Sequence, residues 1–137
     1  VTLSELARLA PSRIIILGGP GAVADAVADQ LVAYASDGLS RWAGADRYAT
    51  AAAVSAAVFP GGADVVFVAT GANFPDALAG GPGGGVLGGP ILLTGRDSVP
   101  QVTLSELARL APSRIIILGG PGAVADAVAD QLATYVS

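Results

Sequence analysis

The sequence predicts a three-layer α/β fold with a mostly parallel sheet, in tandem repeats of about 101 residues. A block of 31 residues occurs twice, letter for letter, at residues 1–31 and 102–132. Short, largely β-branched apolar clusters also alternate with segments whose apolar residues recur at helical spacing. Such alternation of strands and helices is typical of a parallel sheet covered by helices on its two faces.

Strands are predicted where apolar clusters are short and bounded by turn residues. Three clusters are clear, and a fourth, around Trp42, is weaker. The clear strands are residues 14–17 (repeated at 115–118), 65–69 and 91–93, and the weaker one is residues 39–43.

Helices are predicted between these strands. Ser4 caps a short helix from Glu5 to about Ala10, and a second helix covers residues 22–34. Asp46 caps a helix that runs to about Val58. Pro75 suits the first turn of a further helix, which then meets a glycine-rich run at residues 80–85. There the helix is either packed very closely or kinked or broken.

A period of 101 residues is the size of a domain rather than of a solenoid repeat. We therefore divide the chain into the C-terminal third of a preceding repeat, residues 1–36, and one complete repeat, residues 37–137. The first segment is expected to lack sheet partners of its own. A neighbouring chain or the upstream part of its repeat would then cover its apolar strand.

Composition excludes several classes of function. The net charge is −4 and all seven basic residues are Arg, so no basic stripe for nucleic acid is expected. The apolar clusters are much shorter than the roughly 18 residues that span a bilayer, so membrane insertion is not expected. Cys and His are absent, which removes disulfides, thiolates and the commonest metal ligand, and no metal or cofactor is expected.

Four ordered motifs follow one another in the complete unit. They are RWAGADRYATA from Arg41, VATGANFPDAL from Val68, GGPILLT from Gly88 and RIIILGGPGAV from Arg114. In order and spacing they closely resemble the type 2 cell-wall-binding repeat of Gram-positive surface proteins, over residues 41 to about 132. One departure is the run of glycines at residues 83–85, where relatives usually carry Leu and Ala.

The resemblance implies a Rossmann-like module, usually in tandem and often grouped in threes around a pseudo-threefold axis. It also implies an extracellular location and non-covalent binding to an anionic secondary polymer of the cell wall. Arg can hold phosphate or carboxylate with two hydrogen bonds, so Arg41 and Arg47 are the leading candidates for that contact. The complete set of candidate polymer-binding residues is Arg41, Arg47, Asn73, Asp76 and Thr94.

Each candidate also has a structural explanation. Arg47 can pair with a carboxylate, and Asn73 can brace the helix that Pro75 begins. Asp76 can complement the positive end of that helix. Thr94 and Thr70 end strands, where ligands of open α/β sheets commonly bind, but a role in a cleft does not follow from position alone. Arg41, on or beside a strand edge, is the candidate most expected to be exposed.

Three functions compete. The first is a non-catalytic wall-binding module, and the second is a structural array that self-associates, with threefold or head-to-tail geometry, into a trimer, stalk or fibre. The third is a nucleotide-binding or hydrolytic enzyme. The loop at residues 119–122 joins a strand to a helix as phosphate-binding turns do, but it lacks both the G-x-G-x-x-G pattern and the Walker lysine.

Overall fold

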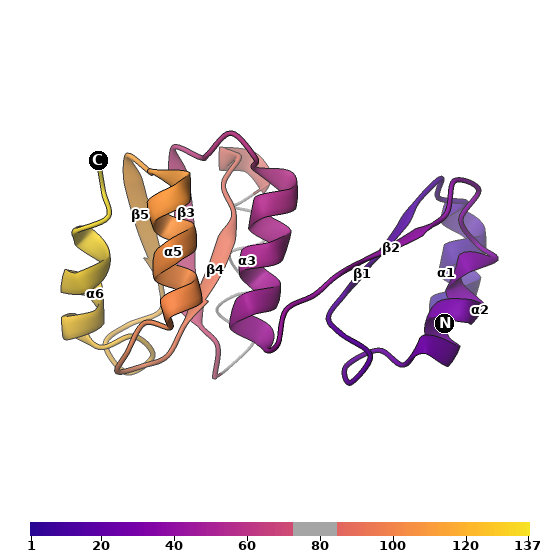
Figure 1. Cartoon of the computed structure of the whole chain (residues 1–137), viewed down its shortest axis with the longest axis horizontal. Coiled ribbons are helices and arrows are strands. Elements are labelled where there is room, and N and C mark those ends of the chain that lie inside the picture. Colours follow the sequence, from indigo (N-terminus) through magenta and orange to yellow (C-terminus); the bar gives the residue numbers. More distant parts are fainter. Residues whose placement is uncertain (73–84) are drawn as a thin grey trace.

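The computed structural model describes residues 1–72 and 85–137. The chain forms two lobes (Figure 1). We call residues 1–42 the N-terminal lobe and residues 47–137 the C-terminal lobe. Each lobe has its own parallel sheet, and a short link joins the second strand of the first lobe to the first helix of the second.

The N-terminal lobe consists of α1 (Thr2–Leu9), β1 (Ile14–Leu17), α2 (Asp25–Val32) and β2 (Leu39–Trp42). Strands β1 and β2 pair in parallel, with Ile14 opposite Leu39 and Leu17 opposite Trp42. The helix α2 is therefore the crossover between two neighbouring parallel strands, as in a βαβ unit.

The C-terminal lobe contains a three-stranded parallel sheet in the order β4-β3-β5. Its elements are α3 (Arg47–Val58), β3 (Val65–Thr70), β4 (Ile91–Thr94), α5 (Gln101–Leu110), β5 (Arg114–Leu118) and α6 (Asp126–Ala133). The central strand β3 pairs with β4 from Phe67 opposite Ile91 and with β5 from Val65 opposite Arg114.

The hydrophobic core belongs to the C-terminal lobe. One face of β3 packs against α5 and α6, and these side chains are almost completely removed from water. Each such aliphatic side chain contributes about 1.5–3 kcal/mol when fully buried. The buried cluster consists of Val66, Val68, Leu92, Leu107, Leu110, Val124, Val128 and Leu132.

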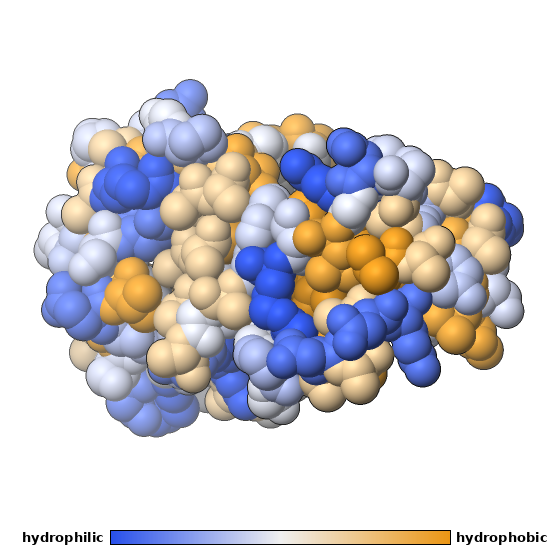
Figure 2. Space-filling view, turned by 45° about the vertical axis from the view of Figure 1, so that its right-hand side comes forward, coloured by the Kyte–Doolittle hydropathy of each residue, from blue (hydrophilic) through white to orange (hydrophobic). Residues whose placement is uncertain are grey.

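The two copies of the repeated block form the same succession of helix, strand and helix, but only the helices of the second copy have buried residues. Leu110 is 3% exposed, whereas its equivalent Leu9 is 56% exposed. Val128 is 1% exposed and its equivalent Val27 is 43% exposed. The difference arises because β3 and β4 cover only the second copy. Hydrophobic side chains consequently gather on the surface of the N-terminal lobe (Figure 2).

All the predicted strands are present within one residue of their expected limits. The pairing of β2 was not foreseen. Residues 1–36 contain a single strand, as expected, but the expected source of its partner is wrong: β1 pairs with β2 of the following segment rather than with a neighbouring chain or the upstream part of the repeat. After α2 the chain forms β2, which pairs in parallel along an edge of β1. The sequence period and the sheets therefore divide the chain at different places.

The helix starts were predicted less well. Asp46 does cap α3, because its Oδ1 accepts the N–H of Ala49 at 2.8 Å. Ser4 is not a cap, since α1 begins at Thr2 and Ser4 lies inside its first turn, which the bond from Glu5 N–H to the Val1 carbonyl closes at 3.0 Å. The segment 22–34 is helical only over α2.

Other predictions about the fold are not tested. The helix expected from Pro75 and most of the glycine run fall on residues 73–84, outside the described residues. The strands described here pair in parallel, as expected, while the third layer and the Rossmann-like details stay predictions. Within the described ranges, every helix is too short or too polar to cross a membrane.

Candidate functional site

A cavity of about 520 Å³ lies where the two lobes meet. One wall is the glycine-rich loop between β1 and α2, and the other is the segment that leads from β2 into α3. Both walls follow the carboxyl ends of parallel strands, the usual position of ligand sites in open α/β sheets. The lining residues are Leu17, Gly18, Gly19, Gly21, Ala22, Gly44, Ala45, Asp46, Arg47 and Thr50.

The wall from Gly44 to Thr50 is built around the start of α3. Besides the Asp46 cap, the N–H of Gly44 donates to Thr50 Oγ1 at 3.0 Å, which fastens the incoming chain to the first turn. A Cβ at position 44 would lie 2.3 Å from the Cβ of Ala49, so a side chain does not fit there. The spacing G-x-D-x-x-x-T in this motif therefore has a structural origin.

The next two residues of the motif dock α3 onto the segment after β3. Arg47 donates from Nη1 to the carbonyl oxygen of Gly71. The ring of Tyr48 packs over Gly71 so closely that a Cβ there would lie 2.6 Å from its Cε1 atom. Arg47 is nevertheless exposed and lines the cavity, so its guanidinium contributes positive charge beside the N-terminus of α3.

Arg41 lies on a strand, as expected, but its side chain is less exposed than expected. It lies on β2 and donates from Nη1 to the Gly18 carbonyl at 2.7 Å, and its Nη2 is 3.3 Å from Oδ1 of Asp25. Only 20% of its side chain is exposed. Arg41 is therefore less exposed than expected, while its role as a ligand group stays a prediction. Pairing of β2 with β1 brings its guanidinium beside a carbonyl and a carboxylate that both accept hydrogen bonds.

Of the other sequence candidates, the one that the structure describes, Thr94, does not line the cavity. Thr94 is fully buried and its Oγ1 donates to the Ser98 carbonyl at 3.3 Å, which ties the end of β4 to the loop that follows it. Thr70, also buried, accepts the N–H of Ala72 at 3.2 Å. Asn73 and Asp76 lie outside the described residues. Sequence reasoning missed Gly44 and Thr50, although both belong to the motif that begins at Arg41.

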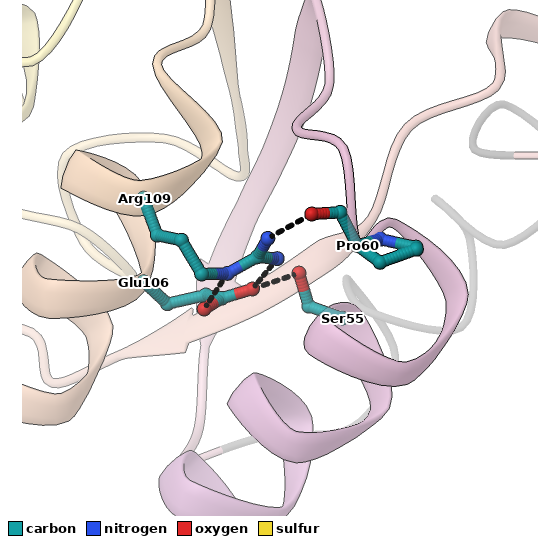
Figure 3. Close-up of polar contacts among 4 residues, drawn as sticks. All are labelled: Ser55, Pro60, Glu106 and Arg109. Atoms are coloured by element: carbon teal, nitrogen blue, oxygen red, sulfur yellow. Dashed lines mark hydrogen bonds and ion pairs between the residues drawn. The ribbon is translucent and has the colours of Figure 1, made fainter.

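One buried carboxylate lies elsewhere, between α3 and α5 (Figure 3). Glu106 accepts from Ser55 Oγ at 2.6 Å and from Arg109, whose Nε is 2.9 Å from Oε2. Arg109 also donates to the Pro60 carbonyl at 3.2 Å. Burial alone would raise the pKa of Glu106, but the hydrogen bonds from Arg109 and Ser55 and the charge of Arg109 outweigh it and lower the pKa. This carboxylate stays ionised and ties two helices together.

The described residues contain no group of three or more His, Cys, Asp or Glu side chains arranged to hold a metal ion. Both carboxylate oxygens of the buried Glu106 already accept hydrogen bonds, from Ser55 and from Arg109. The cavity is thus a place in the described structure where a ligand has room to bind.

A family of wall-binding domains matches this chain. The model of Cell wall binding domain 2 (CWB2) covers residues 41–129, and the chain belongs to this family. The chain is 32% identical over 131 residues to the Amidase enhancer of Bacillus subtilis (strain 168). It is 30% identical over 131 residues to N-acetylmuramoyl-L-alanine amidase LytC of the same strain. Each match covers 96% of this chain, but only 17% and 26% of the respective relatives.

Two solved structures have a similar fold. Cwp6 from Clostridium difficile superposes with a TM-score of 0.87 at 28% identity, over 98% of this chain and 22% of that protein. Cwp8 from the same organism has a TM-score of 0.75 at 24% identity, over 94% of this chain and 21% of that one, and it supports the fold alone. The family and these relatives indicate an extracellular location at the cell wall.

Proposed function

We propose that this chain is a non-catalytic module that attaches to the cell wall by binding an anionic wall polymer in the cavity beside Arg47. The observation that carries the proposal is the position of that cavity. Part of its lining is the first motif of a cell wall binding domain, and it opens after the ends of β1 and β2.

Charge supports an anionic ligand. Arg47, an exposed residue of the cavity lining, and the N-terminus of α3 both favour phosphate or carboxylate groups. The chain as a whole carries a net charge of −4, so attraction has to come from this local arrangement. Binding is therefore expected to weaken as salt screens the contact. Glycines on the opposite wall leave room for the backbone of a polymer to approach closely.

The experiment is sedimentation of the purified chain with isolated cell walls, before and after extraction of their anionic polymer. Wild-type protein should bind intact walls and lose binding after extraction. Arg47→Ala should weaken binding by about 1–3 kcal/mol, the value of a charged hydrogen bond, and Arg47→Lys should weaken it less. Arg13→Ala, which removes the same charge from an exposed position outside the cavity lining, is the matched control.

Folding must be checked in the same variants, because Arg47 also holds Gly71. Circular dichroism and thermal unfolding show whether a loss of binding reflects a loss of structure. Equal binding to extracted and intact walls would contradict an anionic ligand. Unchanged binding in folded Arg47→Ala would remove the cavity from the proposal.

A second function, a self-associating array, is favoured by the apolar surface of the N-terminal lobe. Leu9 and Val27 are exposed there, although their copies are buried in the C-terminal lobe. Threefold or head-to-tail association would cover this surface. Light scattering at high micromolar concentration tests it, and a strict monomer would contradict it.

A further inference from the structure

One edge of β5 is open in this structure. Among the described residues, β5 pairs only with β3, so it is an edge strand of the three-stranded sheet. Its sequence continues from Ile115 as Ile-Ile-Ile-Leu-Gly-Gly, identical to the sequence of β1 from Ile14. In the N-terminal lobe, the same sequence already holds a parallel strand, β2.

The hydrogen bonds show which edge of β1 holds that strand. Ile14 N–H donates to the Gly38 carbonyl at 3.2 Å, and Gly18 N–H donates to the Trp42 carbonyl at 2.9 Å. Successive N–H groups of a strand point to opposite edges. Positions 14, 16 and 18 therefore face β2.

On β5, the edge that faces β3 is the other one. Arg114 N–H donates to the Asp64 carbonyl at 3.0 Å, so positions 114, 116 and 118 face β3. The equivalents of positions 14, 16 and 18 are 115, 117 and 119, and these face the open edge. A strand with this sequence can thus pair with β3 along one edge and with β2 along the other edge.

We propose that the open edge of β5 binds a second copy of the β2 segment, residues 37–46 of this protein. In the register of the N-terminal lobe, Leu39 of the second copy lies opposite Ile115 and its Trp42 lies opposite Leu118. The open sheet then becomes four-stranded, in the order β4-β3-β5-β2. In this arrangement β2 joins consecutive repeats. The sequence period places β2 in the later repeat, whereas the strand that it pairs with belongs to the earlier one.

A side-chain clamp accompanies the strand. In the N-terminal lobe, Arg41 bonds to the Gly18 carbonyl and to Asp25 at the start of α2. The equivalents in the second lobe are Gly119 and Asp126, and Asp126 is exposed in the first turn of α6. Arg41 of the second copy therefore meets the same two acceptors at β5. The same interaction explains why Arg41 is paired rather than exposed.

The test uses the whole chain and a synthetic peptide of residues 36–46, with amide hydrogen exchange followed by NMR. The peptide should slow exchange of Ile115, Ile117 and Gly119 by about tenfold at nine-tenths occupancy, because amides then exchange only from the unbound tenth. Arg114, Ile116 and Leu118 already face β3, so their exchange should change little. No protection at saturating peptide, or protection without this alternation, would overturn the proposal.

Two variants make the test specific. Asp126→Ala in the protein, or Arg41→Ala in the peptide, should lower the affinity about tenfold through loss of a charged hydrogen bond. Asp130→Ala removes the same charge from an exposed position farther along α6 and should leave the affinity unchanged. Equal loss from Asp126→Ala and Asp130→Ala would show a general charge effect and contradict the clamp. Wall binding does not enter this readout, so the test is independent of the proposed function.

Discussion

The hydroxyl of Ser55 on α3 donates to Oε1 of Glu106 on α5 across 2.6 Å, and this bond joins residues 51 positions apart. Arg109 holds the same carboxylate from the next turn of α5. The repeated block contains a second version of the pair, Glu5 and Arg8 on α1, where both side chains are more than half exposed. One ion pair is thus present in a buried and an exposed form in the same molecule.

Replacing Glu106 by Ala should destabilise the chain by about 2 kcal/mol. The variant leaves Arg109 and Ser55 without their shared acceptor at a buried contact between helices. Glu5→Ala is the matched control and should not shift the unfolding midpoint, since an exposed pair contributes little. Urea unfolding followed by circular dichroism measures both. Equal shifts from the two variants would contradict the difference in burial.

The same carboxylate makes stability depend on pH in the acid range. The pKa of Glu106 is lowered from its ordinary value of 4.5, although burial opposes this, by its hydrogen bonds to Arg109 and Ser55 and the charge of Arg109. A group whose pKa is lower in the folded state contributes stability above its unfolded pKa and loses it as pH falls through the folded pKa. Wild-type stability should therefore fall below about pH 4.5 more steeply than that of Glu106→Gln. Parallel pH profiles from urea unfolding of the two proteins would rule out this contribution.

Gly71 should tolerate no side chain. A Cβ there would lie 2.6 Å from Cε1 of Tyr48, and the same residue offers its carbonyl to Arg47. Gly71→Ala should destabilise the chain by about 1–3 kcal/mol, the usual cost of overpacking. Gly61→Ala, where a Cβ meets nothing within 4 Å, is the control. In a Tyr48→Ala background the cost of Gly71→Ala should shrink, which a double-mutant cycle on thermal unfolding measures.

The strands could be predicted because each is a short apolar run between turn residues, as at Ile14 and Val65. The pairing of β2 could not, since its residues Leu39 to Trp42 would fit an open parallel edge in either lobe. The choice between those edges is a tertiary one, and a sequence period does not report it. The cap at Asp46 was foreseen because it depends only on residues three apart.

The candidate site was predicted only in part. Arg47 reaches the cavity because it begins the helix that Asp46 caps. Arg41 was misjudged because its partners, Gly18 and Asp25, are 23 and 16 residues away and meet it only through the pairing of β1 with β2. Thr94 ends a strand as expected, but the chain turns back over it at Ser98 and buries it.

The cavity itself can be filled without disturbing the fold. Gly21 lines it, has a φ outside the left-handed region, and a Cβ there would meet nothing within 4 Å. Gly21→Leu should therefore leave the unfolding temperature unchanged while its side chain occupies space that a polymer needs. Sedimentation with isolated cell walls should show binding reduced by at least about 1.4 kcal/mol, a tenfold loss of affinity.

The repeat supplies the control for this variant. Gly122 is the copy of Gly21, and a Cβ there also meets nothing within 4 Å, but Gly122 does not line the cavity. Gly122→Leu adds the same apolar side chain to the same loop sequence, so any general effect on solubility or nonspecific adhesion is shared by the two variants. Wall binding should be retained in Gly122→Leu and reduced in Gly21→Leu. If both variants bind walls like the wild type, the polymer does not enter this cavity and must bind another surface of the module.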